Sequence, residues 1–161
     1  KDFINTQLIG KQMNDFKWSR FKSKHKSLYE IKTPIYLLTR SSWCLPSKGE
    51  IPALVQLARK YKNEVTFVVL FWDKKANMKK EGQKYSKHID VVYIDESSNK
   101  NDYTIKALKH VLGVPTIYLL DKNKKVKHIS RPVSTPFHYL PKESFKICRD
   151  QIQKQLRAII N

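Results

Sequence analysis

Apolar residues along the chain follow two alternating periodicities. Short runs rich in branched and aromatic residues predict strands at residues 35–39, 65–72, 89–94, 116–120 and 126–129. Apolar residues three or four positions apart predict helices over residues 47–61 and 103–112 and in a last stretch ending near residue 159, and a lysine-rich helix is expected within residues 73–86. The run 65–72 is almost continuously apolar, which is typical of a strand buried on both faces of a parallel sheet. This alternation predicts one α/β domain with a mixed sheet.

The junction between the first predicted strand and helix carries the candidate chemistry. Cys44 lies in a sharp turn there, and we expect it just before the first helical turn, where unpaired N–H groups favour a thiolate. Pro46 suits that first turn because it has no N–H to lose. Pro52 lies inside the predicted helix and should kink it. The pattern therefore predicts a nucleophilic cysteine at the amino end of a helix.

The residues around this turn resemble the active-site motif of the thioredoxin-like superfamily, in particular its TlpA/ResA type. That motif reads Trp-Cys-x-Pro-Cys-x-x-Glu-x-Pro, and the chain matches it at Trp43, Cys44, Pro46, Glu50 and Pro52. A second likeness is the distant Val114-Pro115-Thr116. The resemblance extends over residues 34–130 and the last helix, and is weak over residues 1–33. It implies a thioredoxin-like fold, and the predicted helix and strand between residues 73 and 94 resemble the TlpA-type insertion.

The resemblance also implies roles for the matching residues. Cys44 would be the attacking thiol, and Glu50 would lie near it and tune its protonation, although an exposed Glu50 paired with a lysine is the alternative. Trp43, Pro46, Val114 and a cis Pro115 would form the client-binding surface facing Cys44. Trp43 could instead pack under the loop.

The chain departs from the motif at the second cysteine, where Ser47 stands. A hydroxyl cannot resolve a mixed disulfide, so the site has one thiol, and Ser47 could only donate a hydrogen bond to Cys44. We therefore expect thiol–disulfide exchange by isomerisation, deglutathionylation or covalent capture of a client. The alternative is a non-catalytic thioredoxin-like binding module that has lost the redox cycle. No bound cofactor is expected, with glutathione or another small thiol as co-substrate.

The second cysteine of the chain, Cys148, lies in the apolar register of the last helix, which favours burial over a redox role. Two cysteines are too few for a disulfide scaffold. The five histidines are scattered without metal-ligand spacing, so no metal site is expected.

The formal net charge of +18 comes from 32 Lys and Arg residues against 14 acids. Such a surface attracts anions, including nucleic acid, but no basic stretch forms one long block, and we expect a solvated lysine-rich surface rather than a nucleic-acid partner. Residues 16–26 mix aromatics with cations. They are expected to dock their aromatics on the sheet and keep their lysines in water, with a membrane-surface or nucleic-acid segment as the alternative.

We expect a single domain over residues 1–161, with residues 1–33 as an extension of a core at 34–161. No apolar run reaches the ~20 residues that span a bilayer. The chain begins at Lys1 rather than at a methionine, so a signal sequence or anchor upstream is compatible with it. The family resemblance predicts a periplasmic or other extracytoplasmic location, with the cytoplasm as the alternative. Partners are expected to be cysteine-containing client proteins and an external thiol reductant.

Overall fold

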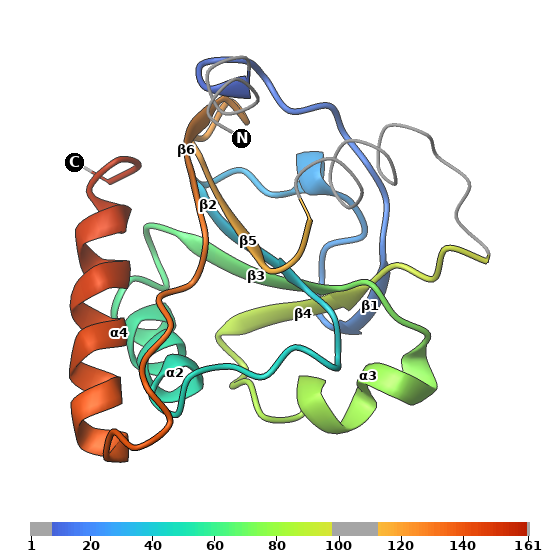
Figure 1. Ribbon diagram of the computed structural model, residues 1–161. Helices are drawn as coiled ribbons and strands as arrows, with labels where there is room; N and C mark the ends of the chain where they lie inside the picture. The colour runs from blue at the N-terminus through green and yellow to red at the C-terminus, as the bar shows by residue number, and fades with distance from the viewer. Residues whose placement is uncertain (1–7, 98–112, 161) are drawn as a thin grey trace.

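The computed structural model describes residues 8–97 and 113–160, and within them six strands form one mixed sheet (Figure 1). In chain order these strands are β1 (Ser19–Lys22), β2 (Ile35–Arg40), β3 (Thr66–Phe71), β4 (Ile89–Tyr93), β5 (Thr116–Leu120) and β6 (Val126–Ser130). Across the sheet they lie in the order β1-β4-β3-β2-β5-β6. The described helices are α2 (Glu50–Lys60), α3 (Lys75–Gly82) and α4 (Pro141–Leu156), with a short 3-10 helix η1 (Leu28–Glu30).

Three of the predicted strands, at residues 35–40, 66–71 and 116–120, form the centre of the sheet. Strand β2 runs parallel to β3, with Leu38 opposite Val69, and antiparallel to β5, with Leu38 opposite Ile117. Strand β4 continues the sheet parallel to β3. All six residues of β2 are buried because the sheet is covered on both faces.

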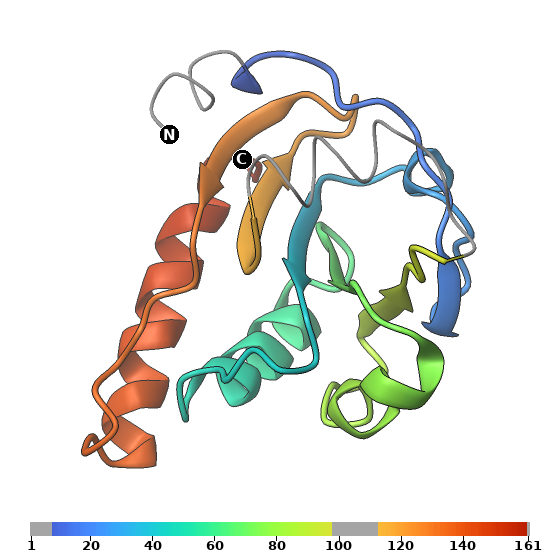
Figure 2. The ribbon, with the colours of Figure 1, turned by 45° about the vertical axis from the view of Figure 1, so that its right-hand side comes forward.

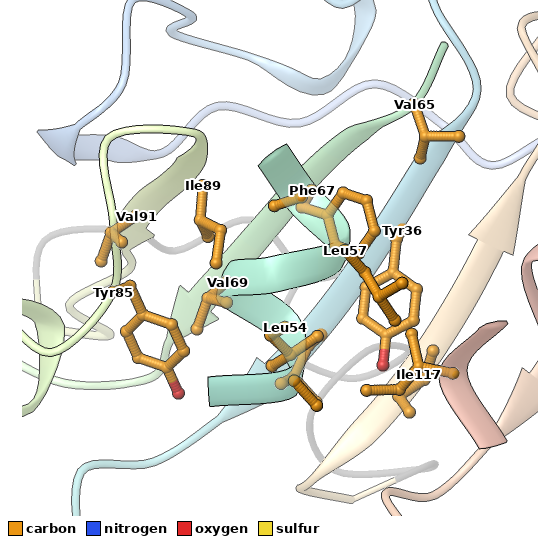
Figure 3. Packing of buried hydrophobic residues seen from close by; sticks show 14 of the residues in the cluster. Tyr36, Leu54, Leu57, Val65, Phe67, Val69, Tyr85, Ile89, Val91 and Ile117 are labelled. Atoms are coloured by element: carbon orange, nitrogen blue, oxygen red, sulfur yellow. The ribbon is translucent and has the colours of Figure 1, made fainter. Parts of the chain in front are cut away.

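One face of the sheet carries a core formed with α2 and α4. Leu54 and Leu57 of α2 pack over Tyr36, Phe67 and other residues of the central strands (Figure 3). The rings of Tyr36 and Phe67 stack with centroids 5.0 Å apart. Helix α4 adds Cys148, Ile152 and Leu156 to this core.

The opposite face is covered by the N-terminal segment, which passes the sheet on the side away from α2 and α4 (Figure 2). Phe16 and Trp18 are buried there, and their rings meet edge to face. Lys17, Lys24 and Lys26 stay exposed. The prediction of docked aromatics and solvated lysines is therefore confirmed for these residues, whereas the half-buried Lys22 donates to the carbonyls of Gln83 and Tyr85. The sequence did not reveal that β1 in this segment pairs antiparallel with β4 and becomes an edge strand.

Helix α2 begins later than predicted. Residues 44–49 are not helical, so Pro46 lies in a loop rather than in the first helical turn. Pro52 is the third residue of α2, where no intrahelical N–H bond is made, and the helix needs no kink to accommodate it.

The predicted lysine-rich helix is α3, which is shorter than expected. Helix α3 and strand β4 lie in the residues 73–94 that resemble the TlpA-type insertion. That they form this insertion stays a prediction. The helix predicted at 103–112 lies outside the described residues. Within residues 8–97 and 113–160, no helix is both long and apolar enough to cross a membrane.

Candidate active site around Cys44

The candidate site lies at the edge of the sheet where β2 and β3 end and β5 begins. Residues 41–49, here called the active-site loop, connect β2 to α2. Thr39 pairs with Thr116 across β2 and β5, so Pro115 lies beside the end of β2. The Val114–Pro115 peptide bond is cis, and Val114 packs half-buried against the core on the N-terminal side of the sheet. The two stretches that carry the motif therefore meet at one edge; that Pro115 faces Cys44 directly stays a prediction.

Cys44 sits in this loop with its side chain half-buried. The backbone N–H of Ser41 donates to Cys44 Sγ over 3.4 Å, and the N–H of Cys44 donates to the Ser41 carbonyl over 3.0 Å. The expectation that Cys44 immediately precedes a helix is wrong, because α2 begins six residues later at Glu50. The donor near the sulfur therefore comes from the loop itself and not from the end of α2.

The start of the active-site loop is hydrogen-bonded to Asp73, which lies between β3 and α3. Asp73 accepts from the backbone N–H of Ser42 at 2.7 Å and from its hydroxyl at 2.9 Å. Cys44 also lines a small pocket together with Glu81 and Tyr85. The thiol is thus bordered on one side by the segment that contains α3.

A buried charge cluster lies beneath the loop. Arg40, the last residue of β2, donates from Nη1 to Glu50 Oε2 over 2.5 Å and to the Tyr85 hydroxyl over 3.1 Å. Burial alone would lower the pKa of Arg40, but the facing Glu50 carboxylate outweighs it and raises that pKa above its usual value. Burial raises the pKa of Tyr85 to about 12 against the opposing effect of Arg40. Arg40 stays charged, and its charge is matched inside the protein.

The surroundings of Glu50 decide against one of its two expected roles. It is buried and paired with Arg40, so the alternative of an exposed glutamate beside a lysine is wrong. It lines a small cavity that also contains Cys148, whereas Arg40 lines the pocket that contains Cys44. The proposed influence of Glu50 on the protonation of Cys44 stays a prediction. In this structure the direct partner of the Glu50 carboxylate is Arg40.

Cys148 is fully buried in α4, as its apolar register predicted. Burial raises the pKa of its thiol, against a hydrogen bond from Ser144 that lowers it, and the Glu50 charge adds to the rise. A protonated and inaccessible thiol is a poor nucleophile.

Ser47 is engaged with residues 131–140, the segment that leads from β6 to α4. Its hydroxyl donates to the Val133 carbonyl over 3.1 Å and accepts from the backbone N–H of Thr135 at 2.9 Å. A hydroxyl can donate one hydrogen bond, and the Ser47 hydroxyl donates it to the Val133 carbonyl. The expected hydrogen bond from Ser47 to Cys44 is therefore not formed in this structure.

The same segment is bound further along. Ser144 of α4 hydrogen-bonds Thr135 Oγ1 at 2.8 Å and accepts from the backbone N–H of Gly49 at 2.9 Å. A Cβ at Gly49 would lie 2.0 Å from the backbone nitrogen of Phe145, so only glycine permits this approach. The active-site loop, the 131–140 segment and α4 are thereby joined in one network.

Several large apolar side chains on the active-site loop and the facing 131–140 segment are exposed. Trp43 is 77% exposed, so it does not pack under the loop. Leu45 is 81% exposed and Phe137 is 80% exposed, and both line a groove of about 250 Å³ between the active-site loop and the 131–140 segment. Pro46 lines this groove and also the pocket of Cys44, so the two are adjacent.

Sequence reasoning missed the partners that hold this loop. Asp73 directly follows the strand predicted at residues 65–72, and because carboxyl ends of parallel strands meet at one edge of a sheet, its place after an apolar run was a usable signal. Arg40 directly follows the predicted first strand, which is a weaker signal of a buried cation. Nothing in the local sequence indicates that Val133 and Thr135 bind Ser47.

Comparison with known proteins agrees with this architecture. The thioredoxin-like protein YneN of Bacillus subtilis (strain 168) is 25% identical over 124 residues, which cover 74% of this chain and 69% of that protein. The thioredoxin domain of a thiol-disulfide oxidoreductase from Bacteroides vulgatus superposes with a TM-score of 0.66 at 15% identity, covering 91% of this chain and 96% of that one. The exposed lipoprotein thioredoxin Etrx1 of Streptococcus pneumoniae gives 0.64 at 16% identity, covering 91% and 100%.

These superpositions show that the fold is thioredoxin-like, as the motif around Cys44 implied. The sequence pattern of the AhpC/TSA family matches residues 9–129, which include β1 to β5 and the active-site loop. The chain therefore belongs to the AhpC/TSA family of thioredoxin-like proteins.

Proposed function

We propose that the protein is a thiol–disulfide exchange protein that works through the single nucleophile Cys44. The observation that carries this proposal is the position of Cys44, half-buried on the loop after the central strand β2, with Ser47 in the second-cysteine position. The same chemistry is supported by a structurally similar protein, since the Bacteroides vulgatus domain belongs to a thiol-disulfide oxidoreductase.

The reaction follows from having one accessible thiol. The Cys44 thiolate attacks one sulfur of a client disulfide, its own proton having passed to solvent, and the other client sulfur leaves as a thiolate. Cys44 and the client are then joined in a mixed disulfide. Because Ser47 cannot attack that bond, release needs either a second client thiol, which isomerises the client, or an external thiol such as glutathione.

The client surface is proposed to comprise Trp43, Pro46, Val114 and Pro115. Trp43 is exposed beside Cys44, and Pro46 borders its pocket. The stretch with Val114 and Pro115 begins at the same edge of the sheet. We propose an extracytoplasmic location, which the exposed lipoprotein among the similar structures supports.

The experiment is incubation of the reduced protein with glutathione disulfide, followed by mass spectrometry of the intact chain. We expect one glutathione adduct on the native protein and on the Cys148→Ser variant, and none on Cys44→Ser. Added reduced glutathione should remove the adduct. An adduct that persists in Cys44→Ser would contradict the assignment of the nucleophile.

A binding module without a redox cycle is the second candidate, and one observation favours it. Helix α2 begins at Glu50, so Cys44 lacks the helix amino terminus that activates a thiol in this type of site. The discriminating measurement is the alkylation rate of Cys44 at neutral pH relative to an unstructured cysteine peptide. A rate below that of the peptide favours the binding module, and a higher rate favours exchange.

A further inference from the structure

Ser47 is the residue whose contacts the exchange reaction does not use. Its hydroxyl holds the backbone of the 131–140 segment at two points, Val133 and Thr135. Its neighbour Lys48 does the same a few residues further on, since Nζ donates to the Tyr139 carbonyl over 3.2 Å. The Lys48 ammonium also lies 5.5 Å from the centre of the Phe137 ring. The position of the missing second cysteine thus fastens one segment of the chain to another.

These contacts set the shape of the groove beside the thiol. One wall consists of Leu45 to Lys48, and the other is formed by residues 134–137. Thr135 of the second wall also hydrogen-bonds Ser144, which in turn accepts from the backbone N–H of Gly49 in the loop. The groove is therefore formed before any client arrives, which lowers the entropic cost of binding in it.

The chemistry of the lining indicates what fits. Leu45, which follows Cys44 in the chain, and Phe137 on the opposite wall present large apolar side chains to solvent in the groove, an arrangement that marks interaction sites. The lining contains one cation, Lys48, and no acidic residue. An occupant with a bulky apolar side chain and a nearby carboxylate is complementary to both features.

We propose that Ser47 is a positioning residue that fixes the wall of an apolar groove, and that this groove selects client cysteines that have a bulky apolar neighbour and a nearby acidic residue. The inference rests on the proposed exchange at Cys44 and names its substrate class. Where a second cysteine would resolve the mixed disulfide, this chain uses the position to hold the client-binding surface.

The test uses short peptides whose single cysteine is activated as a pyridyl disulfide. The Cys44 thiolate forms a bond to the peptide sulfur while the bond to the pyridine sulfur breaks, and the pyridinethiolate takes up a proton and leaves as the coloured thione. Two peptides differ only in the residue beside cysteine, phenylalanine or serine. We expect the phenylalanine peptide to react about tenfold faster, since the free energy gained by partly burying an aromatic side chain corresponds to a factor of about ten.

The ratio of the two rates within each variant reports the groove. It should fall toward one in Phe137→Ala, which removes part of the wall, and in Ser47→Ala, which removes both hydrogen bonds. It should be retained in Ser47→Thr, which keeps a hydroxyl. The matched control is Leu140→Ala, because Leu140 is 64% exposed and does not line the groove. Because Phe137 is exposed, Phe137→Ala is expected to fold normally. It therefore tests the groove even if a Ser47 variant fails to fold.

A second pair of peptides tests the charge, with glutamate or lysine two residues from the cysteine. The glutamate peptide should react several-fold faster at low salt, and the difference should shrink as salt screens it. Lys48→Gln should reduce the preference more than Lys142→Gln, which changes an exposed lysine outside the lining.

Two results would overturn the inference and are distinguishable from a failure of the exchange reaction. Dipyridyl disulfide reports the reactivity of Cys44 without any peptide. If the native protein reacts with it but shows no preference between the phenylalanine and serine peptides, the groove does not select clients. If Phe137→Ala and Leu140→Ala lower the ratio equally, general surface hydrophobicity explains it. If Cys44 does not react with dipyridyl disulfide at all, the exchange function fails and the groove has no part in it.

Discussion

Arg40 and Glu50 form an ion pair in the protein interior, with Nη1 2.5 Å from Oε2, and this pair joins the last residue of β2 to the first residue of α2. The active-site loop is the stretch between these two residues, so the pair closes its base. Both side chains are buried, and the Tyr85 hydroxyl is the further partner of Arg40. The loop that carries Cys44 therefore begins and ends at a buried charge pair.

Replacing Glu50 by Gln should destabilise the protein strongly, because it leaves Arg40 buried without its counter-charge. The expected loss in the free energy of unfolding is about 3–5 kcal/mol. Urea denaturation measures it, and Glu64→Gln, which changes an exposed glutamate just after α2, is the control. A loss below ~1 kcal/mol would mean that water reaches Arg40.

Replacing both partners by apolar residues should cost less than the sum of the two single changes. The double variant Arg40→Met/Glu50→Leu removes both charges, so no uncompensated ion stays inside. A double-mutant cycle of unfolding free energies gives the coupling between the two residues. Additive losses would show that the pair does not act as a unit.

Alkaline pH should weaken the fold through Tyr85. Its pKa is raised from 10.0 to about 12, so the folded protein holds the phenolic proton more tightly than the unfolded chain. The contribution of Tyr85 to stability is therefore complete below pH 10 and is lost as pH rises from there toward 12, because the unfolded state then loses this proton first. Urea denaturation across this range should show a smaller fall in Tyr85→Phe. Tyr36 and Tyr29, whose pKa values are also raised by burial, contribute in the same direction.

The two cysteines should differ in accessibility. In the folded protein, alkylation by iodoacetamide should modify Cys44 and leave Cys148 unmodified, since Cys148 is fully buried and its pKa is raised. Both should react in concentrated urea. Peptide mapping by mass spectrometry separates the sites, and modification of Cys148 first in the folded state would reverse the assignment.

The Ser47→Cys variant tests the one departure from the family motif. A disulfide between Cys44 and the introduced thiol should form on oxidation, and the variant should gain reduction of protein disulfides without added small thiol. The change also removes the hydroxyl that holds Val133 and Thr135, so we expect faster amide hydrogen exchange in the 131–140 segment. Gly49→Ala is unsuitable as a control because its Cβ would collide with Phe145.

A variant that folds but forms no disulfide would show that residues 44–47 are held too far apart. The loop is not helical there, so the spacing of the family motif does not by itself ensure bridging geometry. That outcome would favour the binding module over the exchange reaction.

The pattern of apolar residues along the chain was sufficient for the central sheet. The strands around Leu38, Val69 and Ile117 were predictable because burial on both faces requires a continuous apolar run, and that requirement is local. The burial of Cys148 followed from helical spacing in the same way. The motif around Cys44 likewise identified the thioredoxin-like fold, since it combines several residue types at set spacings.

The tertiary structure alone decided how the site is held. Arg40 pairs with Glu50 and Ser47 binds Val133 only because β2, α2 and the segment before α4 come together at one edge of the sheet. The helix was expected to begin near Cys44, but it begins at Glu50, where Arg40 and the close packing of Gly49 against α4 fix its first turn. Local sequence determines which residues are apolar and how they are spaced. The partners of a polar side chain depend on which distant segments the fold brings within hydrogen-bonding distance, and that information is not local.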